Sequence, residues 1–381
     1  MTDSTYSIDI ALRLREQVLD PIGRDLVGKR EIIEVLAVAL VAGENAFLLG
    51  PPGTGKSALV QELAMRIDGR SFDYLLTKFT EPSELFGPFD LRKLREGELV
   101  TNVEGMLPEA DFVFLDELFN ANSAILNSVL LALNERVFRR GRETMKLPML
   151  MAVGASNWLP DDEALSALYD RFLLRVQCEN VDDALLSEVL EAGWRRQHRA
   201  IEPGVTVDEI RSLQRQATAV SLVSVQKAYV ELVTRLRKVG IPLSDRRAVR
   251  MQRAIAASAV LSGRAEADIS DLWVMETTWD TPAQIEILKA QVMSVREEFS
   301  SDESPSIPSE RVHPMADRNV TPDAEQLSQI VERIAGEADH PTAAEALGLI
   351  AARVPWVTNA NQRVQLEERI EEVRGLIGNS T

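Results

Sequence analysis

Apolar residues recur along this chain with two different spacings. Between residues 46 and 176, short continuous apolar runs alternate with stretches of helical period. Such runs predict buried parallel strands joined by helices that cover both faces of the sheet. We expect strands at residues 46–49, 72–76, 112–115, 150–155 and 172–176. The pattern therefore predicts an α/β fold for this part of the chain.

The segments on either side carry only helical periods. Residues 8–19 and 31–42 predict two helices, with Pro21 and Gly23 as a break between them. Later helices are expected at 182–196, 222–237, 245–261 and 269–279. Residues 300–323, rich in proline, serine and acidic side chains, predict an extended linker. The helices beyond it, at 324–336, 343–353 and 361–377, are expected to pair with a helix at 284–299.

Composition and charge restrict the class of protein. With 381 residues, 45% of them hydrophobic, the chain has material for two or three domains. Its formal net charge of -17 disfavours a nucleic-acid partner, because such binding usually depends on clustered Lys and Arg. The single cysteine, Cys178, cannot form an intramolecular disulfide, and the sequence shows no signal peptide or membrane-spanning run. We therefore expect a cytoplasmic protein without direct membrane insertion.

A glycine-rich segment follows the first predicted strand. Residues 50–57, Gly-Pro-Pro-Gly-Thr-Gly-Lys-Ser, match the pattern G-x-x-x-x-G-K-[ST] of a phosphate-binding loop. The glycines let backbone N–H groups turn toward phosphates, and the helix predicted at 57–67 adds the partial positive charge of its N-terminus. We expect Lys56 to reach the β- and γ-phosphates, and the Ser57 hydroxyl to bind Mg²⁺.

The predicted nucleotide contacts come from two segments. Val27 and Gly28, between the first two helices, are candidate contacts of the adenine. The phosphate-binding loop is expected to contribute Pro52, Gly53, Thr54, Gly55, Lys56, Ser57 and Ala58. The expected cofactors are therefore ATP and Mg²⁺.

Two adjacent carboxylates end the strand predicted at 112–115. Asp116 can hold Mg²⁺ through water, and Glu117 can orient and polarise the water that attacks the γ-phosphate. Two acids after an apolar run are also common where a strand simply runs into solvent, so the interpretation depends on the phosphate-binding loop upstream. Together the two motifs predict hydrolysis of the nucleotide.

The strand predicted at 150–155 leads to an amide side chain. Asn157 is the expected polar sensor, because its amide can hydrogen-bond both the γ-phosphate and the attacking water. The alternative is that residues 157–160, Asn-Trp-Leu-Pro, form only a turn.

An arginine lies at the start of the last predicted strand. In ring-forming ATPases an arginine at this edge completes the site of the neighbouring subunit, and Arg171 is the expected arginine finger. Arg175 is the competing candidate. The alternative role is a structural salt bridge between Asp170 and either arginine.

A second pair of arginines begins the helix predicted at 245–261. Ser244 is the expected N-cap, and two arginines in the first turn oppose the helix dipole. They are explained if they face a bound triphosphate, and we prefer Arg246 over Arg247 in this role. A solvated basic turn is the alternative.

As a set, these segments resemble the AAA+ ATPases, and within them the MoxR family. The resemblance covers about residues 10–280 and rests on segments 47–57, 86–88, 107–110, 114–117, 122–127, 133–136 and 155–157. The RavA type is the most similar, through segments 81–88, 165–171, 244–247 and 261–264. The inserted β-rich domain of that type has no counterpart in the short segment 300–323, so its enzyme partner is not expected here.

The resemblance implies an activity, an assembly and a partner. It implies ATP hydrolysis to ADP and phosphate by a hexameric ring with chaperone-like action on a protein partner, often one with a von Willebrand factor A domain. It also implies hairpin insertions at 89–106 and 137–143 that face the central pore or the substrate side. The basic turn at 139–142 can instead be a solvated hairpin tip.

The resemblance also implies a domain order. We expect an AAA+ α/β nucleotide-binding domain at 1–180, an all-α lid at 181–280 and a C-terminal helical bundle at 281–381. Alternative functions are the motor subunit of a metal chelatase and a nucleotide-gated scaffold that hydrolyses ATP slowly. A DNA motor fits the negative charge poorly, and the Gly-Ala-Phe-Thr-Gly-Ala loop of enhancer-dependent activators is missing from the sequence.

Overall fold

The chain forms two compact units. The computed structural model describes residues 9–140, 143–160, 163–197, 199–300, 311–317, 324–338, 343–351, 353–354, 357 and 359–378. One unit, here the sheet unit, consists of residues 21–211 and 277–282. The other, here the helical unit, consists of the segment up to Asp20, residues 212–276 and the chain from Ala283 onward.

A five-stranded parallel sheet organises the sheet unit, in the order β2-β3-β6-β1-β7. Its strands are β1 (Ala46–Leu49), β2 (Ser71–Leu75), β3 (Phe112–Asp116), β6 (Met151–Ser156) and β7 (Leu174–Gln177). β1 and β6 are buried along their whole length, as expected of continuous apolar runs in a sheet covered on both faces. The predicted α/β class is therefore confirmed.

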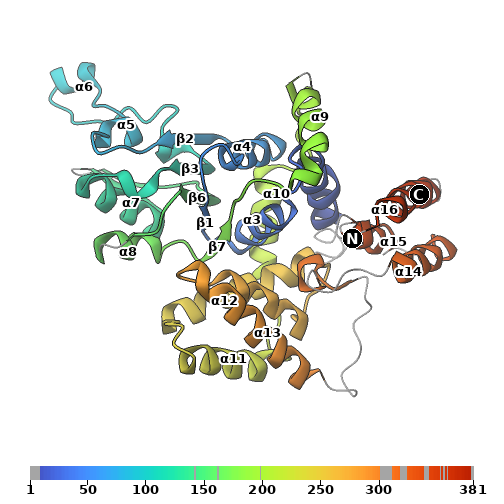
Figure 1. Ribbon diagram of the computed structural model, residues 1–381. Coiled ribbons are helices and arrows are strands. Elements are labelled where there is room, and N and C mark those ends of the chain that lie inside the picture. Colours follow the sequence, from blue (N-terminus) through green and yellow to red (C-terminus); the bar gives the residue numbers. More distant parts are fainter. Residues whose placement is uncertain are drawn as a thin grey trace. The chain divides into compact units, whose positions relative to one another are not determined.

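Helices cover the two faces of this sheet. In Figure 1, α3 (Arg30–Ala42) and α4 (Lys56–Arg66) lie on one side, and α7 (Ser123–Glu135) and α8 (Glu163–Tyr169) on the other. On the side of α8, the Phe47 ring of β1 packs against Tyr169 at 5.0 Å and against Phe119 at 5.4 Å between ring centroids. Two further helices follow β7, α9 (Leu186–Gln197) and α10 (Val207–Ala217), of which α10 crosses the boundary between the units.

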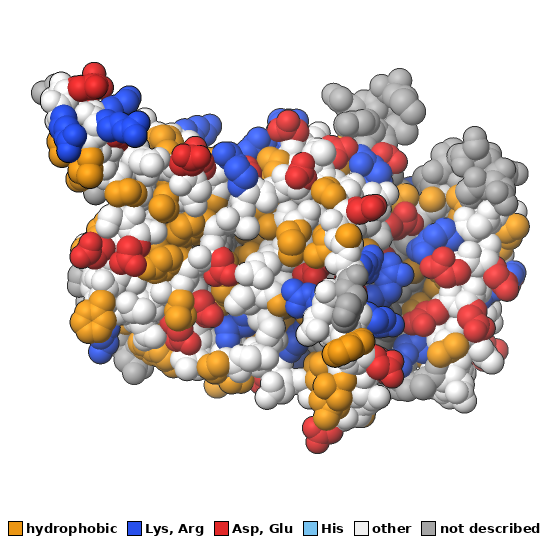
Figure 2. All heavy atoms as spheres, turned by 90° about the horizontal axis from the view of Figure 1, so that it is seen from above, with side chains coloured by type: hydrophobic (Ala, Val, Ile, Leu, Met, Phe, Trp, Pro, Cys, Tyr) orange, Lys and Arg blue, Asp and Glu red, His pale blue; other side chains and the backbone are white. Residues whose placement is uncertain are grey.

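Both predicted insertions are present. The first, at 89–106, follows α5 (Pro82–Phe86) and contains the short helix α6 (Leu91–Arg95), and an antiparallel bridge between Phe89 and Thr101 closes it. Figure 2 shows Lys and Arg side chains at the upper left, beside exposed apolar ones, at the end of the molecule where α6 lies. The second insertion is the antiparallel hairpin of β4 (Val137–Arg140) and β5 (Glu143–Lys146). The residues between them, 141 and 142, lie outside the described part of the chain.

The expected break at Pro21 is wrong. A π-helical stretch, Leu14–Leu19, continues directly into α2 (Asp20–Asp25), so helix runs through Pro21 and Gly23. Proline normally interrupts a helix because it lacks an N–H and its ring meets the carbonyl four residues earlier. Here the preceding turn is wider, with the Asp20 N–H bonded to the Arg15 carbonyl, and Pro21 lies in the first turn of α2.

The middle of the helical unit is built from α11 (Gln226–Lys238), α12 (Asp245–Leu261), a 3-10 segment (Ile269–Thr277) and α13 (Ile285–Phe299). Trp273 is fully buried, and its indole N–H donates to the Ser258 hydroxyl at 3.0 Å. Contrary to expectation, α13 packs against α11 and not mainly against the C-terminal helices. Its buried residues Leu288, Val292 and Val295 form one helix face that α11 covers.

The expectation of an extended linker at 300–323 is wrong for its central part. Residues 311–317 contain a 3-10 turn, Pro314–Asp317, and the His313 ring stacks on Trp273 at 4.8 Å. The Arg296 guanidinium donates to the Ala316 carbonyl at 2.6 Å. Buried His313 and Met315 pack this turn against the helical unit, which composition alone did not indicate. Residues 301–310 and 318–323 lie outside the described part.

The last three helices share a core of their own. They are α14 (Ala324–Gly336), α15 (Ala343–Ala351) and α16 (Ala360–Gly378), and Val331, Ile350 and Val373 are among their buried contacts. A Cβ added to Gly348 of α15 would lie 3.1 Å from Leu12, so the N-terminal helix packs closely on this bundle. Within the described residues, no helix has both the length and the apolar content to cross a bilayer.

Candidate nucleotide site

The phosphate-binding loop connects β1 to α4 at the carboxyl edge of the sheet. Gly53 and Gly55 have φ angles of 82° and 87°, in the left-handed region that favours glycine. A Cβ on either residue would meet nothing within 4 Å. These glycines are therefore required by backbone conformation, and they leave open space where the N-terminus of α4 can receive an anion.

Lys56 is already oriented toward this loop. Its Nζ donates to the carbonyls of Gly50 and Pro51, each at 2.9 Å, and its side chain is buried. The Thr54 hydroxyl donates to the Pro51 carbonyl at 3.0 Å and stiffens the same turn. The ammonium is thus held at the loop by backbone carbonyls, where it can exchange these contacts for phosphate oxygens.

The first glycine of the loop permits a close approach to the neighbouring strand. A Cβ on Gly50 would lie 1.9 Å from the Cys178 carbonyl oxygen, just after β7. The Cys178 N–H donates to the Leu49 carbonyl at 2.7 Å. Gly50 therefore fixes the start of the loop against β7, a role that the motif alone did not specify.

Gly28, one of the two predicted adenine contacts, lies against the segment that follows β7. Gly28 has a φ of 72°, and a Cβ there would lie 2.6 Å from Val181 and 3.7 Å from Leu185. The Lys29 ammonium donates to the Glu179 carbonyl and joins the same two segments. Our sequence reasoning missed Val181 and Leu185, because no local pattern links residues so far apart in the chain.

Asp116 and Glu117 lie at the end of β3, as predicted. One Asp116 carboxylate oxygen accepts from the Glu117 N–H at 2.9 Å. Glu117 has a φ of 51°, an uncommon conformation for a non-glycine residue that often marks a functional turn. Its carboxylate accepts from the Asn120 amide at 3.3 Å. The turn therefore holds both carboxylates in defined positions at the carboxyl edge of the sheet.

Asn157 directly follows β6, the strand between β1 and β3. The Gly50 N–H donates to the Ser156 carbonyl at 3.0 Å, so the end of β6 is bonded to the start of the phosphate-binding loop. Asn157 itself is exposed. A Cβ on Gly154 would lie 2.8 Å from Phe172 and 2.9 Å from Leu118, so only glycine fits there. Asn157 is thus brought next to the loop, as its proposed sensor role requires.

Asn45 organises this part of the sheet although no motif pointed to it. Its side-chain oxygen accepts from the Ala152 N–H at 3.2 Å and from Arg136 at 3.1 Å. Its amide nitrogen donates to the Arg171 carbonyl at 3.4 Å. The Asn45 side chain therefore links β6 to the segment that carries the predicted arginine finger.

The two candidate finger arginines differ in their surroundings. The Arg175 side chain is 1% exposed and forms an ion pair with Asp280. It also donates to the Trp279 carbonyl at 2.7 Å and lies 3.8 Å above the Tyr169 ring. Arg171 is 20% exposed, with its guanidinium 3.9 Å from the Asp170 carboxylate. The Arg175 guanidinium is therefore already bonded within its own chain, and Arg171 stays the predicted finger.

Loss of the Arg175 side chain is expected to destabilise the sheet unit. Arg175→Ala removes the guanidinium hydrogen bonds to the carbonyls of Phe172, Tyr169 and Trp279. Breaking a buried ion pair costs about 3–5 kcal/mol, so the Tm should fall by about 10 °C in a thermal melt. The control is Arg139→Ala, which removes the exposed Glu135 pair, worth at most about 1 kcal/mol. Equal melting temperatures for the two variants would contradict this role for Arg175.

Asp73 is a further carboxylate close to the site. It lies on β2, and burial together with the charge of Asp116 raises its pKa above the ordinary value, although the Gln61 amide, bonded at 2.8 Å, opposes the shift. The folded state therefore binds this proton more tightly than the unfolded chain does. Stability consequently decreases as pH rises from the ordinary aspartate value through the raised one.

Asp73→Asn is expected to remove the loss of stability that the ionised Asp73 carboxylate causes at neutral pH. Because the side chain is partly exposed, the gain in Tm at pH 7 should be only about 1–3 °C, and it should shrink as the pH is lowered toward about 4. Melting curves over this pH range check the prediction, with Glu104→Gln, a change at an exposed loop residue, as the control. A gain in Tm that grows as the pH is lowered would contradict the raised pKa of Asp73.

The predicted lid arginines lie in the helical unit. The Ser244 hydroxyl accepts from the Arg247 N–H at 3.2 Å, so the predicted N-cap of α12 is confirmed. Arg247 is buried and Arg246 is exposed. Only Arg246 is thus accessible to a ligand from solvent, and its contact with nucleotide stays a prediction.

The donor set suits Mg²⁺ bound together with nucleotide phosphates. Ser57 in the first turn of α4 and Asp116 at the end of β3 provide a hydroxyl and a carboxylate, and Mg²⁺ takes oxygen ligands and usually shares them with substrate phosphates. Within the described residues, no group of three or more His, Cys, Asp and Glu side chains could hold a metal alone. The loop and these two oxygens fit a magnesium–nucleotide complex better than an isolated ion.

The sheet order, the phosphate-binding loop and the carboxylates after β3 define a P-loop ATPase of the AAA+ class. Two family models match the chain: the MoxR domain of MoxR-vWA-beta-propeller ternary systems over residues 12–215, and an AAA lid domain over residues 223–292. The chain therefore belongs to the MoxR family of AAA+ ATPases. The finer resemblance to the RavA type stays a prediction.

Relatives and solved structures agree with this assignment. The chain is 32% identical over 293 residues to an uncharacterised protein of Methanocaldococcus jannaschii, covering 75% of each chain. It is 26% identical over 165 residues to the chaperone MoxR1 of Mycobacterium tuberculosis, covering 42% of this chain and 43% of that one. A candidate ATPase of Cytophaga hutchinsonii, 19% identical, has the same fold with a TM-score of 0.62, over 77% of this chain and 96% of that one.

Proposed function

We propose that this protein is a Mg-ATP-hydrolysing motor that remodels or activates a protein partner. The observation that carries the proposal is the hydrogen bond between Gly50 and Ser156, which joins the phosphate-binding loop to the strand end before Asn157. Glu117 projects from the end of the next strand in a defined turn. Binding alone does not need a positioned carboxylate, whereas activation of water does.

The working assembly is proposed to be a homo-oligomeric ring, with six subunits as the family resemblance implies. Arg171 would complete the site of the neighbouring subunit, since Arg175 is already engaged in its own fold. Arg246 would contact the nucleotide from the helical unit. The name of the matched family model supports a partner with a von Willebrand factor A domain, and the name of the mycobacterial relative supports a chaperone-like role.

Phosphate release from ATP tests this function directly. We expect turnover by the full chain with Mg²⁺, loss of turnover with EDTA, and loss of ATP binding in Lys56→Ala. A slow nucleotide-gated scaffold would bind ATP with little phosphate release. A chelatase motor would also hydrolyse ATP but would support insertion of a metal by another subunit, so an assay of ATP-dependent metal insertion separates the two motors.

A further inference from the structure

Asp73 shares a face of the sheet with Asp116. In the parallel pair of β2 and β3, Asp116 is the partner of Leu75. Leu75 lies two positions after Asp73 on β2, and residues two apart on a strand point to the same face. Side chains of partners in register also lie on one face. The carboxylates of Asp73 and Asp116 therefore project from the same side of the sheet, and Asp73 is accessible to solvent.

This side of the sheet is the one that α4 covers. The Gln61 amide on α4 donates to the Asp73 carboxylate at 2.8 Å, and α4 packs against both β2 and β3. Gln61 lies one turn after Ser57, the predicted hydroxyl ligand of Mg²⁺, and residues four apart are neighbours on the surface of a helix. Ser57, Asp73 and Asp116 therefore converge where the start of α4 faces β2 and β3.

The negative charge of these two carboxylates is not paired within the described part of the chain, where neither Asp73 nor Asp116 forms an ion pair. Burial and the charge of Asp116 raise the pKa of Asp73, so the two carboxylates lie close enough to repel each other. Asp111, directly before β3, differs because it accepts from the Arg211 guanidinium at 3.3 Å. The pair near Ser57 therefore favours an added cation.

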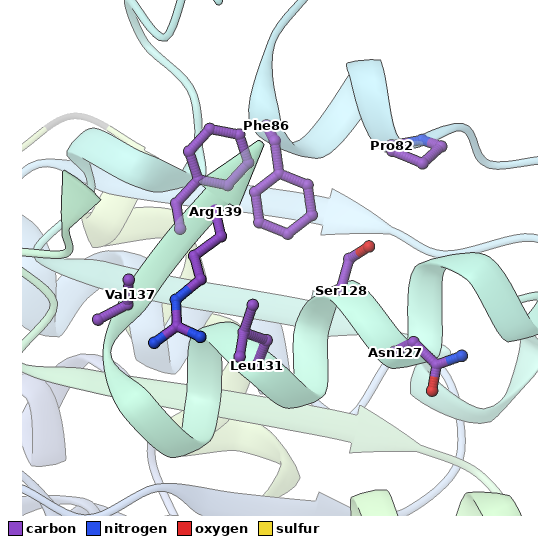
Figure 3. Close-up of a pocket in the computed structure, with 8 residues that line it drawn as sticks. Pro82, Phe86, Asn127, Ser128, Leu131, Val137 and Arg139 are labelled. Carbon is purple, nitrogen blue, oxygen red and sulfur yellow. The ribbon is translucent and has the colours of Figure 1, made fainter. Parts of the chain in front are cut away.

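The cavity in Figure 3 does not offer a comparable site for a cation. It has a volume of about 260 Å³ and lies between α5, α7 and β4. None of its eight described lining residues, which include Phe86, Leu131 and Arg139, carries a carboxylate. Mg²⁺ in nucleotide sites is usually bound through carboxylates and phosphates. The carboxylates beside α4 therefore suit the cation, and this cavity does not.

A second carboxylate agrees with the usual chemistry of Mg²⁺. This ion keeps several of its waters and is held by one or two carboxylates together with the phosphates of the substrate. Asp116 provides the first carboxylate, and Asp73 provides the second. The loss of stability that the Asp73 charge causes at neutral pH is then explained, because groups that serve a site often lower the stability of the fold.

We propose that Asp73 is a positioning residue for the cation of the nucleotide, and that with Asp116 it makes the site select the magnesium complex of ATP over free ATP. The inference rests on the proposed function, since it concerns the same site. Without Mg²⁺, the two carboxylates repel the triphosphate. With Mg²⁺, they attract the hydrated ion, so the same charges favour binding.

The test measures binding of a fluorescent ATP analogue to the full chain, with EDTA and with excess Mg²⁺. Asp73→Asn loses the charge but keeps an oxygen that can accept from Gln61, and Asp73→Glu keeps the charge. Thermal melts verify that the variants are folded. Asp208→Asn is the matched control, because the Asp208 side chain is 90% exposed and pairs with Arg211, which is bonded to Asp111 before β3.

The wild type is expected to bind the analogue more tightly with Mg²⁺ than with EDTA. For Asp73→Asn this effect of Mg²⁺ should be about tenfold smaller, since groups around a metal's ligands typically change its affinity by about 10–100-fold. In EDTA the same variant should bind more tightly than the wild type, because one repelling charge is gone. Asp73→Glu should regain most of the Mg²⁺ effect, and Asp208→Asn should match the wild type.

The dependence of phosphate release on free Mg²⁺ gives a second measurement. At saturating ATP, Asp73→Asn should need about tenfold more Mg²⁺ for half of its maximal rate. The maximal rate itself should stay within about threefold of the wild type, because Asp73 acts through the cation and touches no reacting atom. A purely structural role would not divide the effects in this way.

The inference would be overturned by an equal Mg²⁺ effect on binding in Asp73→Asn and the wild type, or by wild-type binding that does not depend on Mg²⁺. Equal weakening of Asp73→Asn in EDTA and in Mg²⁺ would also refute it, since Asp73 would then serve only the fold. A wild type that shows the expected binding but releases no phosphate would support the role of Asp73 and refute the proposed function, so the two failures are distinguishable.

Discussion

Replacement of Glu117 by glutamine is expected to lower the turnover of ATP at least about a hundredfold, while ATP still binds. A positioned general base typically contributes 10²–10⁴ to a rate, and glutamine keeps the shape of the side chain but cannot accept the proton. The Asn120 amide, which donates to the Glu117 carboxylate, can still donate to the glutamine oxygen, so the turn should remain folded. Single-turnover phosphate release and nucleotide binding separate the loss of chemistry from a loss of affinity.

Glu109→Gln provides a matched control for this experiment. Glu109 is also a glutamate of the sheet unit, but it lies before β3 and pairs with Arg70 at 3.9 Å. Its replacement should leave turnover unchanged within about twofold. Undiminished hydrolysis by Glu117→Gln would remove Glu117 from the mechanism, and joint loss of binding and turnover would make it a residue of the fold.

Replacement of Arg171 by alanine is expected to lower turnover about 10³-fold or more, the range known for arginine fingers. Because the finger acts on the site of the neighbouring subunit, the defect should be complemented between subunits. An Arg171→Ala subunit mixed with a Glu117→Gln subunit should regain part of the activity, since some interfaces then combine an intact Glu117 with an intact Arg171.

Complementation distinguishes a finger from a structural arginine. The salt bridge with Asp170, 3.9 Å long, is the structural alternative. In that case Arg171→Ala would lower the melting temperature, and mixing would restore nothing. A mixture with no regained activity would therefore contradict the finger assignment.

Most of the sheet unit was predictable because its signals are local. Continuous apolar runs predicted the five parallel strands. Asp116 ends one of them, and the glycine-rich loop, Glu117 and Asn157 each follow a strand directly. Parallel strands place their carboxyl ends at one edge of a sheet, so these side chains were expected to converge. The left-handed glycines and the buried Lys56 agree with that expectation.

The features that were missed depend on contacts between residues distant in sequence. The helix continues through Pro21 because a wider turn precedes it, which composition does not show. Residues 311–317 pack because His313 meets Trp273, forty residues earlier. Asn45 and Val181 acquire their roles only when β7 is placed beside β1. Single-sequence patterns carry no information on such contacts.

We propose that ATP hydrolysis occurs at a site shared between neighbouring subunits. The most direct test of this proposal is steady-state ATPase activity as a function of protein concentration, with the mass of the species measured by light scattering in the same samples, with and without Mg-ATP. Activity per subunit is expected to rise as a species of about six subunits appears. A monomer with the same activity per subunit would contradict both the ring and the role of Arg171.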